Sequence, residues 1–222
     1  HLEVWEALLA DMPMTAMIRN LGNMSKIGLL IPGSDASRKI CKELADKDKL
    51  KKARIHPITI LMAERTYASG HGLRGSGEWN AVPQVIDALD DAFYAAFDNV
   101  KPTSKRWIIG LDVSRSMSSS VAGTAMSCAE GSTALALVTA HTEQDYLIVA
   151  FANQLRQVAF SKKTRLDDAL KQTQNMNFGG TDCSLPMIAA LQNNLKFDVF
   201  VVLTDSETWA GKIHPVQALR QY

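Results

Sequence analysis

Three short, almost continuously apolar runs in the second half of the chain constrain its fold more than any other feature. They lie at Trp107–Leu111, Tyr146–Phe151 and Val199–Leu203, and segments with helical spacing separate them. Such runs are typical of strands buried on both faces of a parallel sheet. Their alternation with helices predicts a doubly wound, Rossmann-like α/β sheet. In sheets of this kind, ligands bind beyond the carboxyl ends of the strands.

Oxygen-bearing side chains follow two of these runs directly. Asp112, Ser114 and Ser116 come after the first run, and Asp205 comes after the third. Thr181, in the sequence Gly-Gly-Thr-Asp, lies in a predicted loop before a helix. These carboxylates and hydroxyls form a hard-cation ligand set without thiol or imidazole. We therefore expect a divalent-cation site at one edge of the sheet, for Mg²⁺ or, as the alternative, Mn²⁺.

The same residues also have a purely structural interpretation. Asp112 can cap a turn, and Ser114 and Ser116 can cap the next helix, because such side chains satisfy free backbone N–H groups. The Asp-x-Ser-x-Ser run alone does not separate the two interpretations. The presence of all three pieces of the pattern in one chain favours the metal site.

The first part of the chain follows a different pattern, in which apolar residues recur at helical spacing between short polar links. Predicted helices cover Val4–Leu9, Met14–Gly22 and Ser37–Ala53, and two more begin at Pro57 and Pro83. Successive helices with short connections are typical of an α-solenoid or bundle. We expect a helical domain over residues 1–103 and an α/β domain over residues 104–222.

Composition narrows the class of protein. Hydrophobic residues make up 46% and charged residues 21%, an ordinary globular balance, and the net charge of +1 gives no global basic field. The three cysteines are widely spaced, which argues against zinc and against a disulfide framework. This favours a cytoplasmic protein, with the nucleus as the alternative in a eukaryote. We see no secretory leader and no membrane-spanning run. The chain begins without Met and ends inside a predicted helix, so we expect part of a longer protein.

Longer runs of the sequence resemble known families. The metal pattern is similar to the metal-ion-dependent adhesion site (MIDAS) of von Willebrand factor A domains. Five further runs resemble the Ro ribonucleoprotein autoantigen family, in which a helical TROVE module precedes such an A domain: Glu3–Gly22, Lys51–Pro57, Gly70–Gly75, Gly179–Ile188 and His214–Pro215. The resemblance covers essentially the whole chain. It implies HEAT-like helical repeats followed by an A domain, with the chain truncated at both ends.

The resemblance also implies a function, which is RNA binding in a ribonucleoprotein. Ro proteins bind small noncoding Y RNAs and the ends of misfolded RNAs, so these are the expected partners, in RNA quality control. By the same match, the metal positions are Asp112, Ser114, Ser116, Thr181 and Asp205. A partner's acidic side chain or a phosphate oxygen would complete the coordination of Mg²⁺.

A locally basic segment provides the expected RNA contacts. Residues 38–54 contain eight basic and three acidic side chains in an otherwise balanced region, and phosphate contacts depend on such local charge. The expected RNA-binding residues begin in this segment and continue into the turns that follow it: Lys49, Lys51, Lys52, Arg54, His56, His71 and Arg74. The alternative is a solvated helix face. Aromatic residues are not interleaved here, which favours backbone contacts over base recognition.

Two other functions are alternatives to RNA binding. In the first, the A domain binds an acidic residue of a protein partner through the metal, without direct RNA contact. The second is an enzyme with Asp112 as a nucleophile. Ser114 stands where such sites usually carry a second carboxylate, and no Gly-x-Ser-x-Gly elbow is present. The run Gly70-x-Gly72-x-x-Gly75 matches a dinucleotide fingerprint but lacks the βαβ context. We therefore expect a binding protein rather than an enzyme.

Overall fold

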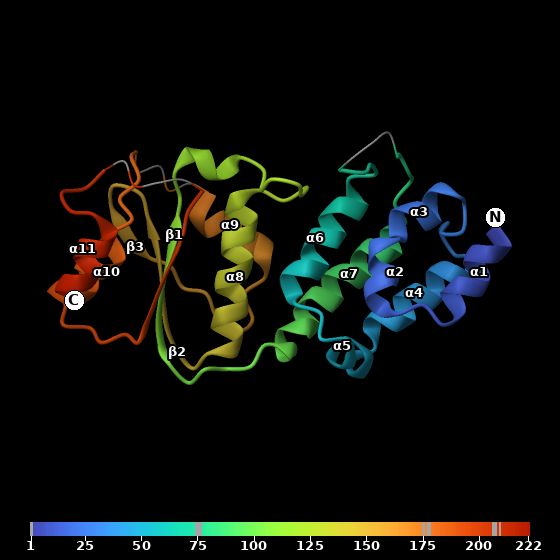
Figure 1. The fold of residues 1–222 in the computed structure, drawn as a ribbon, viewed down its shortest axis with the longest axis horizontal. Coiled ribbons are helices and arrows are strands. Elements are labelled where there is room, and N and C mark those ends of the chain that lie inside the picture. The colour runs from blue at the N-terminus through green and yellow to red at the C-terminus, as the bar shows by residue number, and fades with distance from the viewer. Residues whose placement is uncertain (1, 74–76, 175, 177–178, 206–207, 209) are drawn as a thin grey trace. The chain divides into compact units, whose positions relative to one another are not determined.

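The structure is a computed structural model that describes residues 2–73, 77–174, 176, 179–205, 208 and 210–222 (Figure 1). It divides into two compact units. The first unit comprises residues 1–100 together with 122–126, and the second comprises residues 101–121 together with 127–222. None of the helices in the described ranges is long and apolar enough to cross a membrane.

The first unit is helical. Its elements in chain order are α1 (Leu2–Ala10), α2 (Met14–Arg19), α3 (Leu21–Lys26), α4 (Asp35–Ala45), α5 (Lys47–Ala53), α6 (Pro57–Ala68), α7 (Pro83–Ala95) and the 3-10 helix η1 (Ala96–Asn99). Helix α7 packs against both α4 and α6. The core between them is formed by fully buried apolar side chains: Ile40, Leu44, Ile60, Leu61, Leu89 and Phe93.

Two predicted helices are each interrupted once. The prediction of one helix over Ser37–Ala53 is wrong, because α4 ends before Asp46 and α5 begins after it. The Asp46 carboxylate accepts a hydrogen bond of 3.0 Å from the backbone N–H of Lys49 and so caps the new helix. The predicted helix over Met14–Gly22 likewise divides at Asn20, whose side chain donates to the carbonyl of the preceding turn at 2.9 Å. Polar side chains that bond to their own backbone compete with helix continuation in this way.

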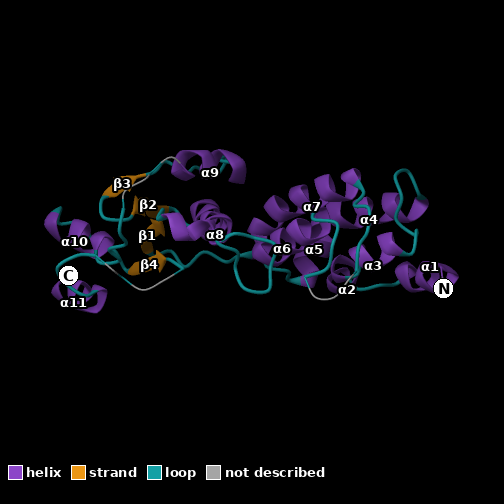
Figure 2. Cartoon of the chain, turned by 90° about the horizontal axis from the view of Figure 1, so that it is seen from above, coloured by secondary structure: helices purple, strands orange, loops and turns teal. Residues whose placement is uncertain are grey.

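The second unit is a four-stranded sheet covered by helices. Its elements in chain order are β1 (Arg106–Asp112), η2 (Arg115–Ser118), α8 (Cys128–Thr142), β2 (Asp145–Phe151), β3 (Leu155–Gln157), α9 (Leu166–Gln174), α10 (Leu185–Gln192), β4 (Val199–Leu203) and α11 (Pro215–Gln221). The strand order is β3-β2-β1-β4. Strand β1 pairs in parallel with β2 and β4, and β3 is an antiparallel edge strand. Figure 2 shows α8 and α9 on one face of the sheet and α10 and α11 on the other. The doubly wound arrangement predicted from the apolar runs is confirmed.

Small residues let the helices lie close to the central strand. On one face, Ala134, Ala136 and Ala140 of α8 are completely buried. On the other face, a Cβ atom at Gly110 of β1 would lie 2.8 Å from Cγ of Pro186, in the first turn of α10. The absence of a side chain at position 110 therefore makes room for α10.

The topology determines where a ligand can bind. The chain passes from β1 through α8 to β2 on one side, and it places β4 on the other side of β1. Neighbouring parallel strands whose connections leave in opposite directions open a crevice at their carboxyl ends. Asp112 is the last residue of β1, and Asp205 follows the end of β4 by two residues. Both carboxylates therefore belong to the same edge of the sheet.

Candidate functional site

The carboxylate of Asp112 joins the loops that follow β1 and β4. Asp112 is only 2% exposed. Its Oδ1 accepts a hydrogen bond from the backbone N–H of Ser114 at 2.8 Å, and its Oδ2 accepts one from Oγ1 of Thr204 at 2.7 Å. The carboxylate is thus fixed by one donor from each loop.

Hydroxyl groups connect this loop to the second carboxylate. Oγ of Ser114 lies 3.1 Å from Oγ of Ser116, and Ser116 donates to Oδ1 of Asp205 at 3.0 Å. Ser119 donates to the other oxygen of Asp205 at 3.4 Å. Four of the predicted metal residues, Asp112, Ser114, Ser116 and Asp205, therefore form one hydrogen-bonded cluster.

The loop that carries Thr181 is attached to the segment after β4. The carbonyl of Thr181 accepts hydrogen bonds from the backbone N–H of Ala210 at 2.9 Å and from Oγ1 of Thr208 at 3.2 Å. The backbone N–H of Cys183 also donates to Oγ1 of Thr208, at 3.2 Å. Within the described residues, the Thr181 hydroxyl forms no hydrogen bond with either carboxylate. The backbone of the loop that carries Thr181 is thus hydrogen-bonded to the segment that follows β4.

The sequence pattern did not identify several residues that support the candidate metal site. Thr204 anchors Asp112, and Ser119 anchors Asp205. Asp182 is 6% exposed and accepts a hydrogen bond of 2.9 Å from the backbone N–H of Ser184, next to the start of α10. Gly211, at φ +96°, lies against the Asp182 carboxylate so closely that a Cβ atom there would overlap it. The dipeptide Thr-Asp after β4 was the only available sequence signal for Thr204.

The thiol of Cys183 lies beside the same cluster but is not suited to ligate a metal. Burial raises the pKa of the Cys183 thiol, and the negative charge of Asp112 raises it further. Hydrogen bonds with Thr204 and Thr208 act in the opposite direction on this pKa and are outweighed. Because the thiolate is the form that ligates metals or attacks substrates, this cysteine is a packing residue at neutral pH.

The donor set fits a hard cation. Among the described residues, no group of three or more His, Cys, Asp or Glu side chains is placed to hold a metal ion. The cluster offers two carboxylates and the hydroxyls of neighbouring serines instead. Mg²⁺ accepts such a small oxygen set because it usually keeps several of its own waters.

Four of the predicted RNA-contact residues lie near one another in the first unit. Lys51, Lys52 and Arg54 are exposed in the last turn of α5 and at its C-cap. His56 follows and is the N-cap of α6, where its Nδ1 accepts a hydrogen bond of 3.2 Å from the backbone N–H of Ile58. These residues form the basic corner between α5 and α6.

Of the other three predicted RNA-contact residues, Lys49 and His71 do not strengthen this corner. Nζ of Lys49 is 2.6 Å from a carboxylate oxygen of Glu43, and this hydrogen bond raises the pKa of Lys49. His71 lies beyond the opposite end of α6, a helix of 12 residues and therefore about 18 Å long. Arg74 lies outside the described residues.

Comparisons with known proteins find a matching family in each of the two units. Residues 106–222 match the family described as the Ro60 vWA domain, and residues 1–67 match the family described as the TROVE domain. The chain is 45% identical over 222 residues to RNA-binding protein RO60 of Caenorhabditis elegans, covering 99% of this chain and 34% of that protein. It is 43% identical over 223 residues to RNA-binding protein RO60 of Deinococcus radiodurans, covering 99% of this chain and 42% of that protein.

A solved structure matches as well. The crystal structure of Deinococcus radiodurans RO (RSR) protein superimposes with a TM-score of 0.92 at 42% identity, covering 99% of this chain and 45% of that one. The chain thus spans between a third and a half of the length of these proteins.

Proposed function

The chain belongs to the Ro60 family, and from this premise we propose that it binds RNA as part of a Ro-type ribonucleoprotein and carries a divalent-cation docking site. The observation that carries the proposal is the similarity of 99% of the chain to two proteins named RNA-binding protein RO60. The proposed partners are small noncoding Y RNAs and misfolded RNAs, in cytoplasmic RNA quality control. The names of these relatives favour binding over catalysis.

The basic corner between α5 and α6 is the proposed phosphate contact. Lys51, Lys52 and Arg54 are exposed, and none of them has an ion-pair partner within the described ranges. Each neutralised phosphate releases condensed counterions, so binding through this corner weakens as salt rises. No aromatic side chain lies among these residues, so they contact the backbone rather than read bases.

The salt dependence of RNA binding tests this assignment. In the full-length protein, the double substitution Lys51→Gln/Lys52→Gln should lower the slope of log K against log salt by about 1.4–1.8, because each lost phosphate contact removes about 0.7–0.9. The readout is filter binding of a structured RNA with a single-stranded end at several salt concentrations. A matched control is Lys162→Gln/Lys163→Gln, an adjacent pair of exposed lysines in the second unit. Equal effects of the two double variants, or no effect of the first, would refute the assignment.

The second part of the proposal is a Mg²⁺ site formed by Asp112, Ser114, Ser116, Thr181 and Asp205. The hydrogen-bonded cluster formed by the loops after β1 and β4 supports this site. The hydrogen bonds between the loop that carries Thr181 and the segment after β4 support it as well. A bound divalent ion would supply a positively charged anchor for one anionic group. The protein residues would orient that ion and hold its waters.

Titration with Mg²⁺ and Mn²⁺ tests the metal site directly. Calorimetry of the full-length protein should give binding that Asp112→Asn and Ser116→Ala weaken at least tenfold, about 1.4 kcal/mol. Ser120→Ala, at an exposed serine of the same loop, is the matched control. Binding unchanged by Asp112→Asn would contradict the ligand assignment.

A metal-dependent protein-docking module is the second candidate function. The exposed Asp205 and Ser116, hydrogen-bonded at 3.0 Å, would present a bound ion to an acidic side chain of a partner. Under this alternative, Asp112→Asn abolishes a protein contact while RNA binding does not depend on Lys51 and Lys52. Magnesium-dependent hydrolysis of phosphate esters by the purified protein would instead indicate an enzyme.

A further inference from the structure

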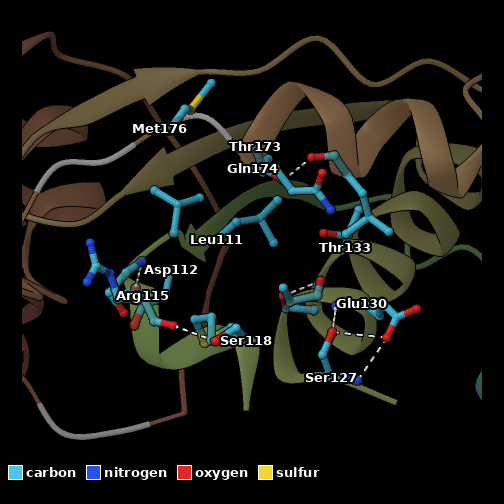
Figure 3. Close-up of a pocket in the computed structure, with 16 residues that line it drawn as sticks. Leu111, Asp112, Arg115, Ser118, Ser127, Glu130, Thr133, Thr173, Gln174 and Met176 are labelled. Carbon is cyan, nitrogen blue, oxygen red and sulfur yellow. Dashed lines mark hydrogen bonds between the residues drawn. The ribbon is translucent and has the colours of Figure 1, made fainter. Parts of the chain in front are cut away.

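The cavity beside the metal cluster belongs to the site already described. It has a volume of about 680 Å³ and lies between the loop after β1, α8 and α9 (Figure 3). Asp112 and Ser114 line it, so it is continuous with the candidate metal site. The first unit has a cavity of its own, which the proposed function does not yet use.

This second cavity is a groove of about 390 Å³ along one face of α6. Sites for small molecules have volumes of roughly 300–1,000 Å³. The opposite wall comes from α2 and α3, through Ile18, Leu21 and Gly22. Positions on α6 that recur at intervals of three and four residues form one helix face, about 12 Å long, and line the groove: Thr59, Met62, Ala63, Thr66 and Tyr67.

A fixed indole forms the wall of the groove near Tyr67. Nε1 of Trp79 donates a hydrogen bond of 2.9 Å to the carbonyl of Tyr67, and the two rings are nearly parallel, with centroids 6.4 Å apart. A Cβ atom at Gly22 would lie 2.8 Å from the indole, so the glycine lets the ring pack on the backbone of α3. An aromatic wall held in this way loses little conformational freedom when a ligand packs against it.

The charge of the groove is positive. Arg19 lines it and is exposed, and its side chain forms no hydrogen bond or ion pair within the described part of the chain. The described residues of the lining include no acidic side chain. Ile55 also lines the groove and stands between Arg54 and His56 in the chain. The groove therefore reaches the basic corner, the proposed phosphate contact.

The lining suits a flat ligand with a polar edge. Ile18 and Leu21 are buried and apolar. Thr15, Asn23 and Thr59 are exposed and offer hydroxyl and amide groups as hydrogen-bond donors and acceptors. A nucleobase has two apolar faces and a hydrogen-bonding edge, and every base can pack on an aromatic side chain.

We propose that one unpaired nucleotide of a bound RNA inserts its base into this groove, against Trp79, while Arg19 and the basic corner contact the adjoining phosphates. The inference rests on the proposed function, because it requires RNA at the basic corner. Proteins recognise single-stranded RNA by packing splayed-out bases on aromatic side chains and by bonding to the base edges. A segment of an acidic protein is the alternative occupant, and the similarity to two proteins named RNA-binding protein RO60 favours RNA.

An abasic scan of the RNA tests the inference on the wild-type, full-length protein. The probe is a structured RNA with a single-stranded end, in which an abasic nucleotide replaces each unpaired position in turn. One of these replacements should weaken binding at least about fivefold in filter binding, the low end of the effect of one base–aromatic contact. The slope of log K against log salt should not change, because the abasic nucleotide keeps its phosphate.

Ala63→Leu fills the groove without changing its charge. Ala63 is half-buried in the lining, and leucine is a good helix former. This variant should weaken the intact RNA at least about fivefold but should not weaken the critical abasic RNA further, because both changes remove the same contact. Ala68→Leu, at an exposed position of α6 outside the lining, is the matched control and should have no effect. Arg19→Gln should lower the salt slope by about 0.7, the value for one phosphate of a single strand.

Other outcomes overturn the inference. If neither the abasic scan nor Ala63→Leu weakens binding, while Lys51→Gln/Lys52→Gln still lowers the salt slope, the groove holds no base and the proposed function stands. If Ala63→Leu weakens the abasic and the intact RNA equally, the groove does not hold the base. If the scan has no effect and an acidic peptide binds the wild type but not Ala63→Leu, the groove is a protein-docking site.

Two controls keep these results separable. Urea unfolding shows whether Ala63→Leu is folded, and if it is not, the abasic scan of the wild-type protein decides alone. A wild-type protein that binds no RNA at all refutes the proposed function itself, and the inference with it.

Discussion

Replacing Thr204 by valine should destabilise the protein through the carboxylate of Asp112. Valine keeps the shape of threonine but removes the hydroxyl that donates to Asp112 at 2.7 Å. A hydrogen bond to a charged group contributes about 1.5–3 kcal/mol, and a buried acceptor left without a partner costs a similar amount. Asp112 is 2% exposed, whereas Thr204 itself is exposed, so water can partly replace the lost donor. We therefore expect the low end of the range, about 1.5 kcal/mol.

The assay is urea unfolding at pH 7 in EDTA, with Thr204→Ser as the matched variant. Serine retains the hydroxyl, so its free energy of unfolding should stay within about 0.5 kcal/mol of the wild type. Mg²⁺ that binds only the folded protein should stabilise the wild type and the serine variant more than the valine variant. If the valine and serine variants unfold at the same urea concentration in EDTA, Thr204 does not anchor Asp112 and the geometry of the cluster is wrong.

Three further substitutions have defined outcomes. Gly211→Ala should destabilise the protein by about 1–3 kcal/mol and weaken Mg²⁺ binding in calorimetry, because a Cβ atom at φ +96° would overlap the carboxylate of Asp182. Asp198→Asn should lower the melting temperature at pH 7, because the hydrogen bonds from Arg106 hold the pKa of Asp198 well below its usual value. A carboxylate with a depressed pKa stabilises the fold above its unfolded pKa, near 4, and this contribution disappears as pH falls through the folded value, so the two melting curves should converge in strong acid. Glu143→Gln should cost about 1–3 kcal/mol in urea unfolding, because this buried carboxylate accepts hydrogen bonds of 2.7 and 3.2 Å from backbone N–H groups before β1.

The strands of the second unit were predictable because their signal is local. The apolar runs at 107–111, 146–151 and 199–203 correspond to β1, β2 and β4 to within one residue at each end. The edge strand β3 (Leu155–Gln157) is the exception, because no comparable apolar run marks it. A short strand with one partner has little apolar pattern to mark its end.

Helix breaks were harder to predict, because capping competes with continuation by only about 1 kcal/mol. Asp46 is compatible with a helix interior by spacing, and only its hydrogen bond to the following turn shows that a new helix starts there. The separation of His56 from His71 could have been anticipated. The 12 residues of α6 lie between them and impose a length of about 18 Å.

The ligand pattern of the candidate metal site could be read from the sequence, whereas its supporting residues could not. Asp112 ends β1 and Asp205 comes shortly after β4, and because these two strands are parallel neighbours, topology alone brings both residues to one edge of the sheet. The donor from Thr204 and the backbone bonds of Thr181 depend on how chain-distant loops pack. No local pattern encodes such contacts, because each joins residues that are far apart in the chain.

The bare backbone at Gly110 has a consequence for chemistry at the sheet edge. Pro186 rests directly over that glycine, and the loop bearing Thr181 enters the same helix a few residues earlier. Any larger residue at position 110 would push the start of this helix outward, and the loop that carries Thr181 would move with it. The position of the loop that carries Thr181 therefore depends on Gly110 in the middle of β1, a residue that has no functional group of its own.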